Sequence, residues 1–118
     1  MNVEAAMKGL NRALTAMGEA VADPARRGDA LRLAAEAQRN CATAKMLPLP
    51  SQFTRDAADE AAKAKIVDEY ASDLRKTMRM LLELEDAVAA GKADEARTIL
   101  ARIEEMRKHA HEELGVKD

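Results

Sequence analysis

Apolar side chains recur at alternating intervals of four and three residues along the start of the chain. At about 100° of rotation per helical residue, this spacing keeps them within an arc of roughly 80°. A half-buried strand would instead place an apolar residue at every second position. The pattern therefore predicts a helix that turns a narrow apolar face into a bundle, and that face consists of Val3, Met7, Leu10, Leu14, Met17 and Val21.

The residue composition extends this prediction to the whole chain. The 118 residues include 26 alanines, 5 glycines and 3 prolines, and the aromatic residues are limited to Phe53 and Tyr70. Alanine is the strongest helix former, whereas strands favour Val, Ile, Thr and aromatic residues. The apolar spacing also continues through a third segment, from Ala57 to Val88. We therefore expect an all-α fold with a core of alanine, leucine and methionine, in a single domain over residues 1–118.

Capping residues and prolines divide the chain into four segments. Asp23 is suited to begin a second helix, and the two prolines of residues 47–50 cannot continue it. Ser51 or Thr54 is then expected to cap a third helix, which Gly91 ends. The four expected helices span approximately residues 2–22, 24–46, 55–90 and 93–114.

Long helices joined by short links, of about two to eight residues, favour an antiparallel up-down-up-down four-helix bundle. In that arrangement the first and fourth helices are neighbours, and the start of one faces the end of the other. Met7 and His111 then fall at the same end of the bundle, where residues 47–50 join the second helix to the third.

The charges exclude several classes of partner. Lysine and arginine total 19 and aspartate and glutamate 21, which gives a net charge of −2, and the two signs are interspersed. Neither nucleic acid nor an anionic membrane is expected as an obligatory partner.

The longest apolar run, residues 87–90, is far too short for membrane insertion. Glycine-rich phosphate loops, GxSxG, HExxH and CxxC motifs are absent, so we expect no enzymatic activity.

Met7 and His111 stand out among the polar and sulfur-containing side chains. A thioether and an imidazole that approach one cavity from opposite walls form the axial ligand set of a Met/His haem iron. Arg107, one turn before His111, is within reach of a haem propionate. Apolar residues of the neighbouring helices would line the slot for the ring, and these are Val3, Leu10, Leu14, Leu74 and Met106.

Three stretches of the chain carry a family resemblance. They are residues 3–11 (VEAAMKGLN), residues 91–97 (GKADEAR) and the Arg107-x-x-x-His111 spacing, with a shorter match at residues 29–31. Together they resemble the cytochrome b562 family of soluble periplasmic four-helix haem proteins. The resemblance spans nearly the whole chain, although the identities are sparse.

This resemblance implies a periplasmic one-electron carrier with one non-covalently bound b-type haem. Met7 and His111 would be the axial ligands, and Arg107 corresponds to an arginine of the family. Tyr70 and Leu74 fall where the best-known member places two phenylalanines against the haem. Leu10 and Leu14 would complete the pocket. A redox partner protein, whose identity the sequence does not give, would exchange electrons with a monomer or weak dimer.

Two other interpretations remain open at the sequence level. Thioether and imidazole groups also suit copper, so a haem-free bundle could hold that metal; its ligands would come from Met7, Met17, Met106, His109 and His111. Alternatively, the alanine- and methionine-rich faces would pack against a partner helix or a second copy. Cys41, the single cysteine, would then link two chains, or would be a buried and inert thiol.

Overall fold

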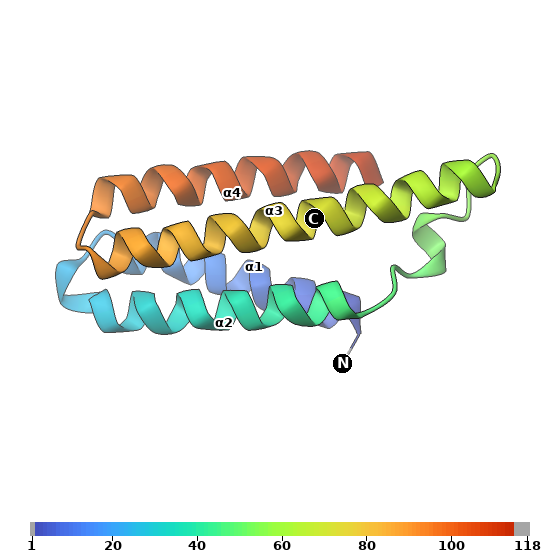
Figure 1. Cartoon of the computed structure of the whole chain (residues 1–118). Helices are drawn as coiled ribbons and strands as arrows, with labels where there is room; N and C mark the ends of the chain where they lie inside the picture. Colours follow the sequence, from blue (N-terminus) through green and yellow to red (C-terminus); the bar gives the residue numbers. More distant parts are fainter. Residues whose placement is uncertain (1, 115–118) are drawn as a thin grey trace.

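The computed structural model describes residues 2–114, with the backbone alone for residues 111, 113 and 114. Within these residues the chain forms four α-helices and two short 3-10 helices, without a strand (Figure 1). The all-helical prediction is confirmed for this part of the chain. The elements in chain order are α1 (Val3–Ala20), η1 (Pro24–Arg26), α2 (Arg27–Met46), η2 (Ser51–Phe53), α3 (Glu60–Ala89) and α4 (Ala93–Leu114).

The helix α1 and the 3-10 helix η1 begin at polar side chains that accept backbone hydrogen bonds. The side chain of Asn2 accepts from the Ala5 N–H at 2.8 Å and caps α1. Asp23 accepts from the Ala25 N–H at 3.0 Å, but the turn that it caps is the 3-10 helix η1. The second α-helix therefore starts at Arg27, three residues later than the sequence predicts.

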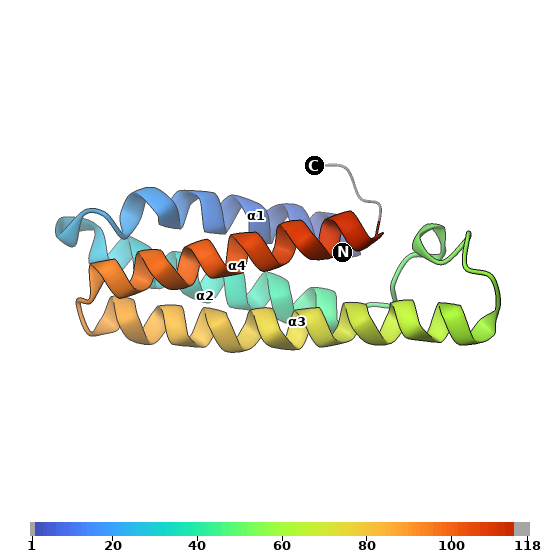
Figure 2. The ribbon, with the colours of Figure 1, turned by 90° about the horizontal axis from the view of Figure 1, so that it is seen from above.

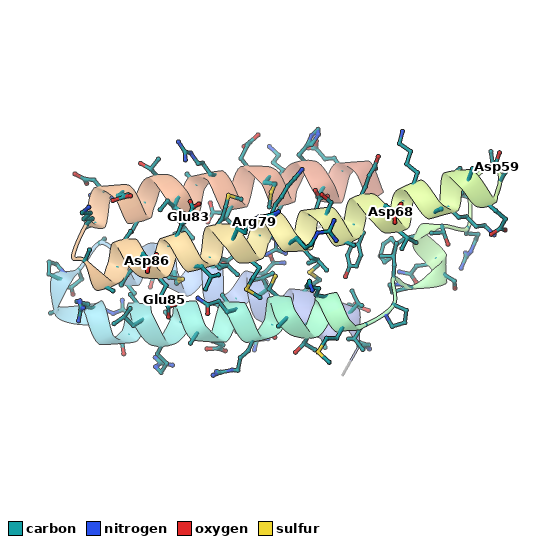
Figure 3. The ribbon with its side chains drawn as sticks, viewed as in Figure 1. Asp59, Asp68, Arg79, Glu83, Glu85 and Asp86 are labelled. Carbon is teal, nitrogen blue, oxygen red and sulfur yellow. The ribbon has the colours of Figure 1, made fainter. Side chains whose placement is uncertain are left out.

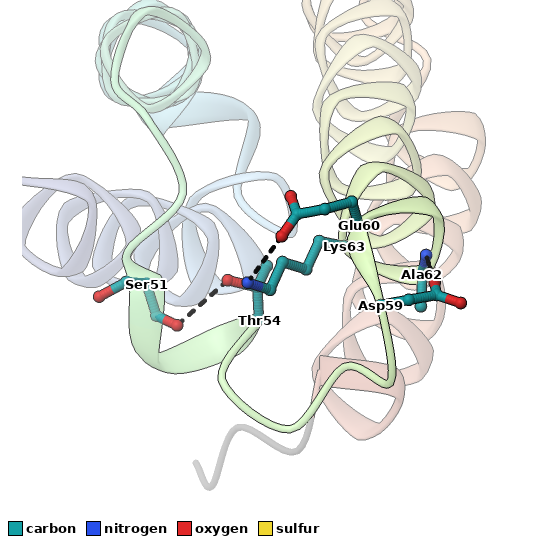
Figure 4. A network of polar contacts seen from close by, with 6 residues as sticks. All are labelled: Ser51, Thr54, Asp59, Glu60, Ala62 and Lys63. Carbon is teal, nitrogen blue, oxygen red and sulfur yellow. Dashed lines mark hydrogen bonds and ion pairs between the residues drawn. The ribbon is translucent and has the colours of Figure 1, made fainter.

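The predicted start of the third helix is wrong. Asp59 caps α3, because its carboxylate accepts from the Ala62 N–H at 2.8 Å. Ser51 instead opens η2, and the Thr54 hydroxyl donates to the Ser51 carbonyl at 3.2 Å (Figure 4). The residues between Thr54 and Asp59 form turns and bends. Aspartate is at least as good an N-cap as serine or threonine, and here the later cap is the one used.

Gly91 ends α3 as predicted. It adopts φ +72°, the left-handed region in which glycine carries no steric penalty. The Gly91 N–H donates to the Val88 carbonyl at 3.1 Å, and the Lys92 N–H donates to the Ala87 carbonyl at 2.9 Å. These two bonds are a Schellman motif, which satisfies the last carbonyls of the helix and reverses the chain toward α4.

The four helices lie side by side along a molecule with principal extents of 51 × 25 × 21 Å (Figures 1 and 2). All four contribute to one buried core. The predicted apolar face of the first helix is confirmed, since Met7 is half-buried and the other members are buried, namely Val3, Leu10, Leu14, Met17 and Val21. Alanines fill much of the remaining core, which allows the helix backbones to approach closely.

The start of α3 extends beyond the neighbouring helices (Figures 1 and 2). The apolar spacing predicts burial from Ala57 onward, yet Val67 is 44% exposed, and the first buried residue of α3 is Tyr70. This part of the prediction is wrong because the other helices end before they reach the first turns of α3. From Tyr70 to Val88, by contrast, the inward face of α3 is buried.

The helices differ in how closely they pack. Each of α1 with α2, α2 with α3 and α3 with α4 forms an extensive interface, whereas α1 and α4 approach each other at few points. The Arg27 guanidinium donates to the Ala89 carbonyl at 2.6 Å, and the Cys41 thiol donates to the Leu74 carbonyl at 3.4 Å. The α1–α4 side is therefore the loosest seam of the bundle.

Candidate functional site

A small cavity lies between α1, α3 and α4, beside the N-terminal half of α1. Its volume is about 30 Å³. Five of the seven predicted site residues line it, which are Met7, Leu10, Tyr70, Leu74 and Arg107. The structure thus brings together side chains from three helices that are far apart in the sequence.

Arg107 is buried, with only 7% of its surface exposed. It follows Ile103 by one helical turn, so it lies on the inward face of α4. Its Nη2 donates to the Sδ of Met7 at 4.0 Å, which is a long contact to a weak acceptor. A guanidinium at the wall of a cavity is well suited to bind an anionic group of a ligand, because such charge-assisted hydrogen bonds are strong.

Tyr70 lines the cavity from α3. The residue is 7% exposed, and its hydroxyl oxygen is buried without a hydrogen-bond partner in the described part of the chain. Burial raises the pKa of the phenol, and the nearby Cys41 thiol raises this pKa further. The hydroxyl therefore stays protonated and remains a hydrogen-bond donor at neutral pH.

Cys41 is completely buried on α2. Its thiol donates to the Leu74 carbonyl, and burial raises its pKa although the positive charges of Arg107 and Lys45 oppose the shift. A buried thiol with a raised pKa is a poor nucleophile. The structure favours the inert thiol over a disulfide between two chains.

The two remaining predicted site residues are Leu14 and His111. Leu14 is buried in the core and does not line the cavity. The backbone of His111 belongs to α4, one turn after Arg107, while its side chain lies outside the described residues. Its role as an axial ligand stays a prediction.

Three further residues line the cavity that the sequence analysis missed, namely Asp73, Thr77 and Ala110. Helical spacing could have identified them. Thr77 is seven residues after Tyr70, and Asp73 is three residues after it, so both share its side of α3. The Thr77 hydroxyl donates to the backbone carbonyl of Asp73 at 2.8 Å, so its hydrogen is not available to a ligand.

The side chains considered for copper are spread over the bundle. Met17 is fully buried, and it lies ten residues from Met7 on the same helix, a distance of about 15 Å along the axis. His109 is exposed on α4. Among the side chains that the structure describes, which exclude those of His111 and Glu113, no group of three or more His, Cys, Asp or Glu is arranged to hold a metal ion.

Most charged side chains are distributed over the outer faces of the helices. Figure 3 labels several along α3, including Asp68, Arg79 and Glu83. The ion pairs in the described residues join neighbours three or four positions apart, such as Lys8 with Glu4 at 3.5 Å, and their side chains are largely exposed. Exposed pairs of this kind contribute little to stability. No helix of residues 2–114 is both long enough and apolar enough to cross a membrane.

The side chains that line the cavity suit a haem, but the cavity is too small to hold one. Met7 offers a thioether ligand, Leu10 and Leu74 offer apolar walls, Tyr70 offers a ring and Arg107 offers a cation. Sites for ligands of this size usually enclose about 300–1,000 Å³, far more than this cavity. A porphyrin would therefore have to part α1 from α4, which is the seam with the fewest contacts.

No family model, curated protein or solved structure matches this chain.

Proposed function

We propose that this protein is an electron-transfer haemoprotein that holds one b-type haem non-covalently between α1, α3 and α4. The observation that carries the proposal is the cavity that Met7 shares with Arg107. Both residues belong to the stretches that resemble the cytochrome b562 family, and they are one hundred positions apart in the chain. The resemblance and the cavity thus point to the same end of the bundle.

An antiparallel up-down-up-down order of the helices belongs to this proposal. Two contacts support opposite directions for α2 and α3, because Arg27 pairs with Ala89 whereas the later residue Cys41 pairs with the earlier residue Leu74. The Met7 contact with Arg107 supports opposite directions for α1 and α4, since it joins the start of one to the later part of the other.

Four residues that line the cavity, together with His111, have roles in the proposed site. Met7 and His111 would bind the haem iron, and a bound haem would supply one-electron chemistry. Methionine ligation raises the reduction potential, which favours the ferrous state. Leu10 and Leu74 would exclude water, and Arg107 would exchange its weak contact with sulfur for a propionate.

We further propose that the protein is an electron carrier and not an enzyme. One electron would be gained or lost without a bond being made or broken in a substrate. A periplasmic location, a separate redox partner protein and a monomeric or weakly dimeric state follow from the same resemblance.

The experiment that tests this function is an optical titration with haemin, followed by reduction with dithionite. We expect a sharp Soret band that saturates at one haem per chain, and narrow α and β bands after reduction. Binding that never saturates, with broad bands of unspecific association, would refute the proposal. Thermal unfolding with and without one equivalent of haemin gives an independent check, because a ligand that binds the native state raises its Tm.

A further inference from the structure

The Tyr70 hydroxyl is a buried donor without an acceptor among the described residues. Tyr70 lines the cavity, and its hydroxyl oxygen is buried within the protein. A phenylalanine would fill the same space without this unfavourable group. An unsatisfied polar group in a native structure requires an explanation, and a ligand atom that accepts the bond is one.

The surroundings of the hydroxyl indicate the chemistry of that ligand atom. The cavity has room for a group the size of one or two water molecules. Arg107 lines it from α4, and a guanidinium with a hydroxyl donor is a common pair for a carboxylate. Asp73 also lines the cavity, but no described side chain or backbone group accepts the hydrogen of the Tyr70 hydroxyl.

We propose that Tyr70 is the polar anchor of this site, and that its hydroxyl donates a hydrogen bond to a carboxylate of the bound molecule. The inference rests on the proposed function where that carboxylate is a haem propionate. A small free carboxylate offers the same group, and the experiments below separate the two sources.

The first experiment measures the affinity of wild type and Tyr70→Phe for haemin and for haemin dimethyl ester, in which both carboxylates are blocked. Tyr70→Phe should weaken haemin binding about tenfold, equivalent to about 1.4 kcal/mol, and weaken binding of the ester less, because the uncharged ester carbonyl is a poorer acceptor than a carboxylate. Thr77→Val is the matched control, because Thr77 also lines the cavity but its hydroxyl already donates to the backbone carbonyl of Asp73. Equal haemin affinity in wild type and Tyr70→Phe would overturn the inference.

The second experiment needs no haem. Ligand-free Tyr70→Phe should unfold at a higher temperature than wild type, because the variant lacks the unsatisfied donor. Sodium acetate, compared with sodium chloride at equal ionic strength, should raise the Tm of wild type more than that of the variant. A lower Tm for ligand-free Tyr70→Phe would show that the hydroxyl is already satisfied, which overturns the inference.

The two experiments separate this inference from the proposed function. If wild type takes up no haemin but acetate stabilises it selectively through Tyr70, the anchor stands and its ligand is a small carboxylate. If haemin saturates wild type and Tyr70→Phe with equal affinity, the haem function stands and the anchor is refuted.

Discussion

The Nη2 atom of Arg107 lies 4.0 Å from the Sδ atom of Met7, although one hundred positions separate the two residues in the chain. The contact joins the start of α1 to the last third of α4. The interface between these two helices is less extensive than those of α1 with α2, α2 with α3 and α3 with α4. A thioether is a weak acceptor, so little is lost when the two groups separate. The contact can therefore join α1 to α4 in the ligand-free protein. In the proposed complex it would break, and the Met7 sulfur would bind the haem iron while Arg107 would bind a propionate.

Met7→Leu should keep the fold and remove the proposed axial sulfur. Exchange of methionine for leucine conserves volume and usually costs less than about 1.5 kcal/mol. We expect a native helical spectrum and the loss of the narrow α and β bands from the reduced haemin complex. Met17→Leu is the control, because Met17 is fully buried on the same helix but does not line the cavity. Identical reduced spectra for Met7→Leu and wild type would exclude Met7 as a ligand.

The stability of the protein should fall in alkaline solution. Burial raises the pKa of Cys41 above its ordinary value of 9.0 and the pKa of Tyr70 above 10.0. The folded state then holds both protons more tightly than the unfolded state. The free energy of unfolding is therefore highest below about pH 9, and it decreases as the pH rises because the unfolded state loses these protons first. Urea unfolding at pH 8 and at pH 10.5 measures the difference.

Cys41→Ala should show a smaller alkaline loss than wild type, and Cys41→Ala combined with Tyr70→Phe a smaller loss still. The comparison uses the change with pH within each variant, so a constant effect of the substitution on packing cancels. A wild-type stability that is constant over this range would contradict both raised pKa values.

Gly91→Ala and Gly28→Ala should change stability in opposite directions. Alanine at position 91 must adopt φ near +72°, which costs about 1 kcal/mol or more. Position 28 is helical, and no heavy atom lies within 4 Å of the point that an alanine Cβ would occupy there, so alanine should stabilise α2 by up to about 1 kcal/mol. Chemical denaturation of the two variants tests this, and the same sign for both would be the contrary result.

Leu81 and Leu82 are adjacent in α3 but differ in burial, with exposed fractions of 0% and 47%. Leu81→Ala should destabilise the protein by about 2–5 kcal/mol, because it opens a cavity in the core. Leu82→Ala should change the free energy of unfolding by no more than about 0.5 kcal/mol. Similar losses for the two variants would show that the outer face of α3 is covered in solution.

The helical class and much of the core could be predicted from the sequence, because both depend on local spacing. The apolar face from Val3 to Val21 needs only the helical period, and Gly91 needs only its permitted backbone conformation. The start of α3 could not be predicted in the same way, because Ser51, Thr54 and Asp59 are all suitable caps. The choice among them depends on where the connecting turns lie.

The composition of the candidate site was only partly predictable. Met7 and Arg107 were predicted from the expected bundle geometry and also from the resemblance, and Tyr70 was predicted from the resemblance alone. The cavity brings the three together. The unsatisfied state of the Tyr70 hydroxyl could not be inferred, because it depends on which acceptors the neighbouring described helices place within reach. Likewise, the exposure of Val67 follows from the unequal lengths of the helices, which no pattern within α3 reveals.

The projecting start of α3 divides that helix into two regions of unequal local stability. Amide hydrogens of its first turns are held by helical bonds alone, so they should exchange with solvent through brief local fraying. Those from Tyr70 onward are covered by the core and should exchange only through opening of much of the bundle. The boundary between fast and slow exchange thus falls at Tyr70, so the cavity lies where the fraying end of α3 meets its rigid part.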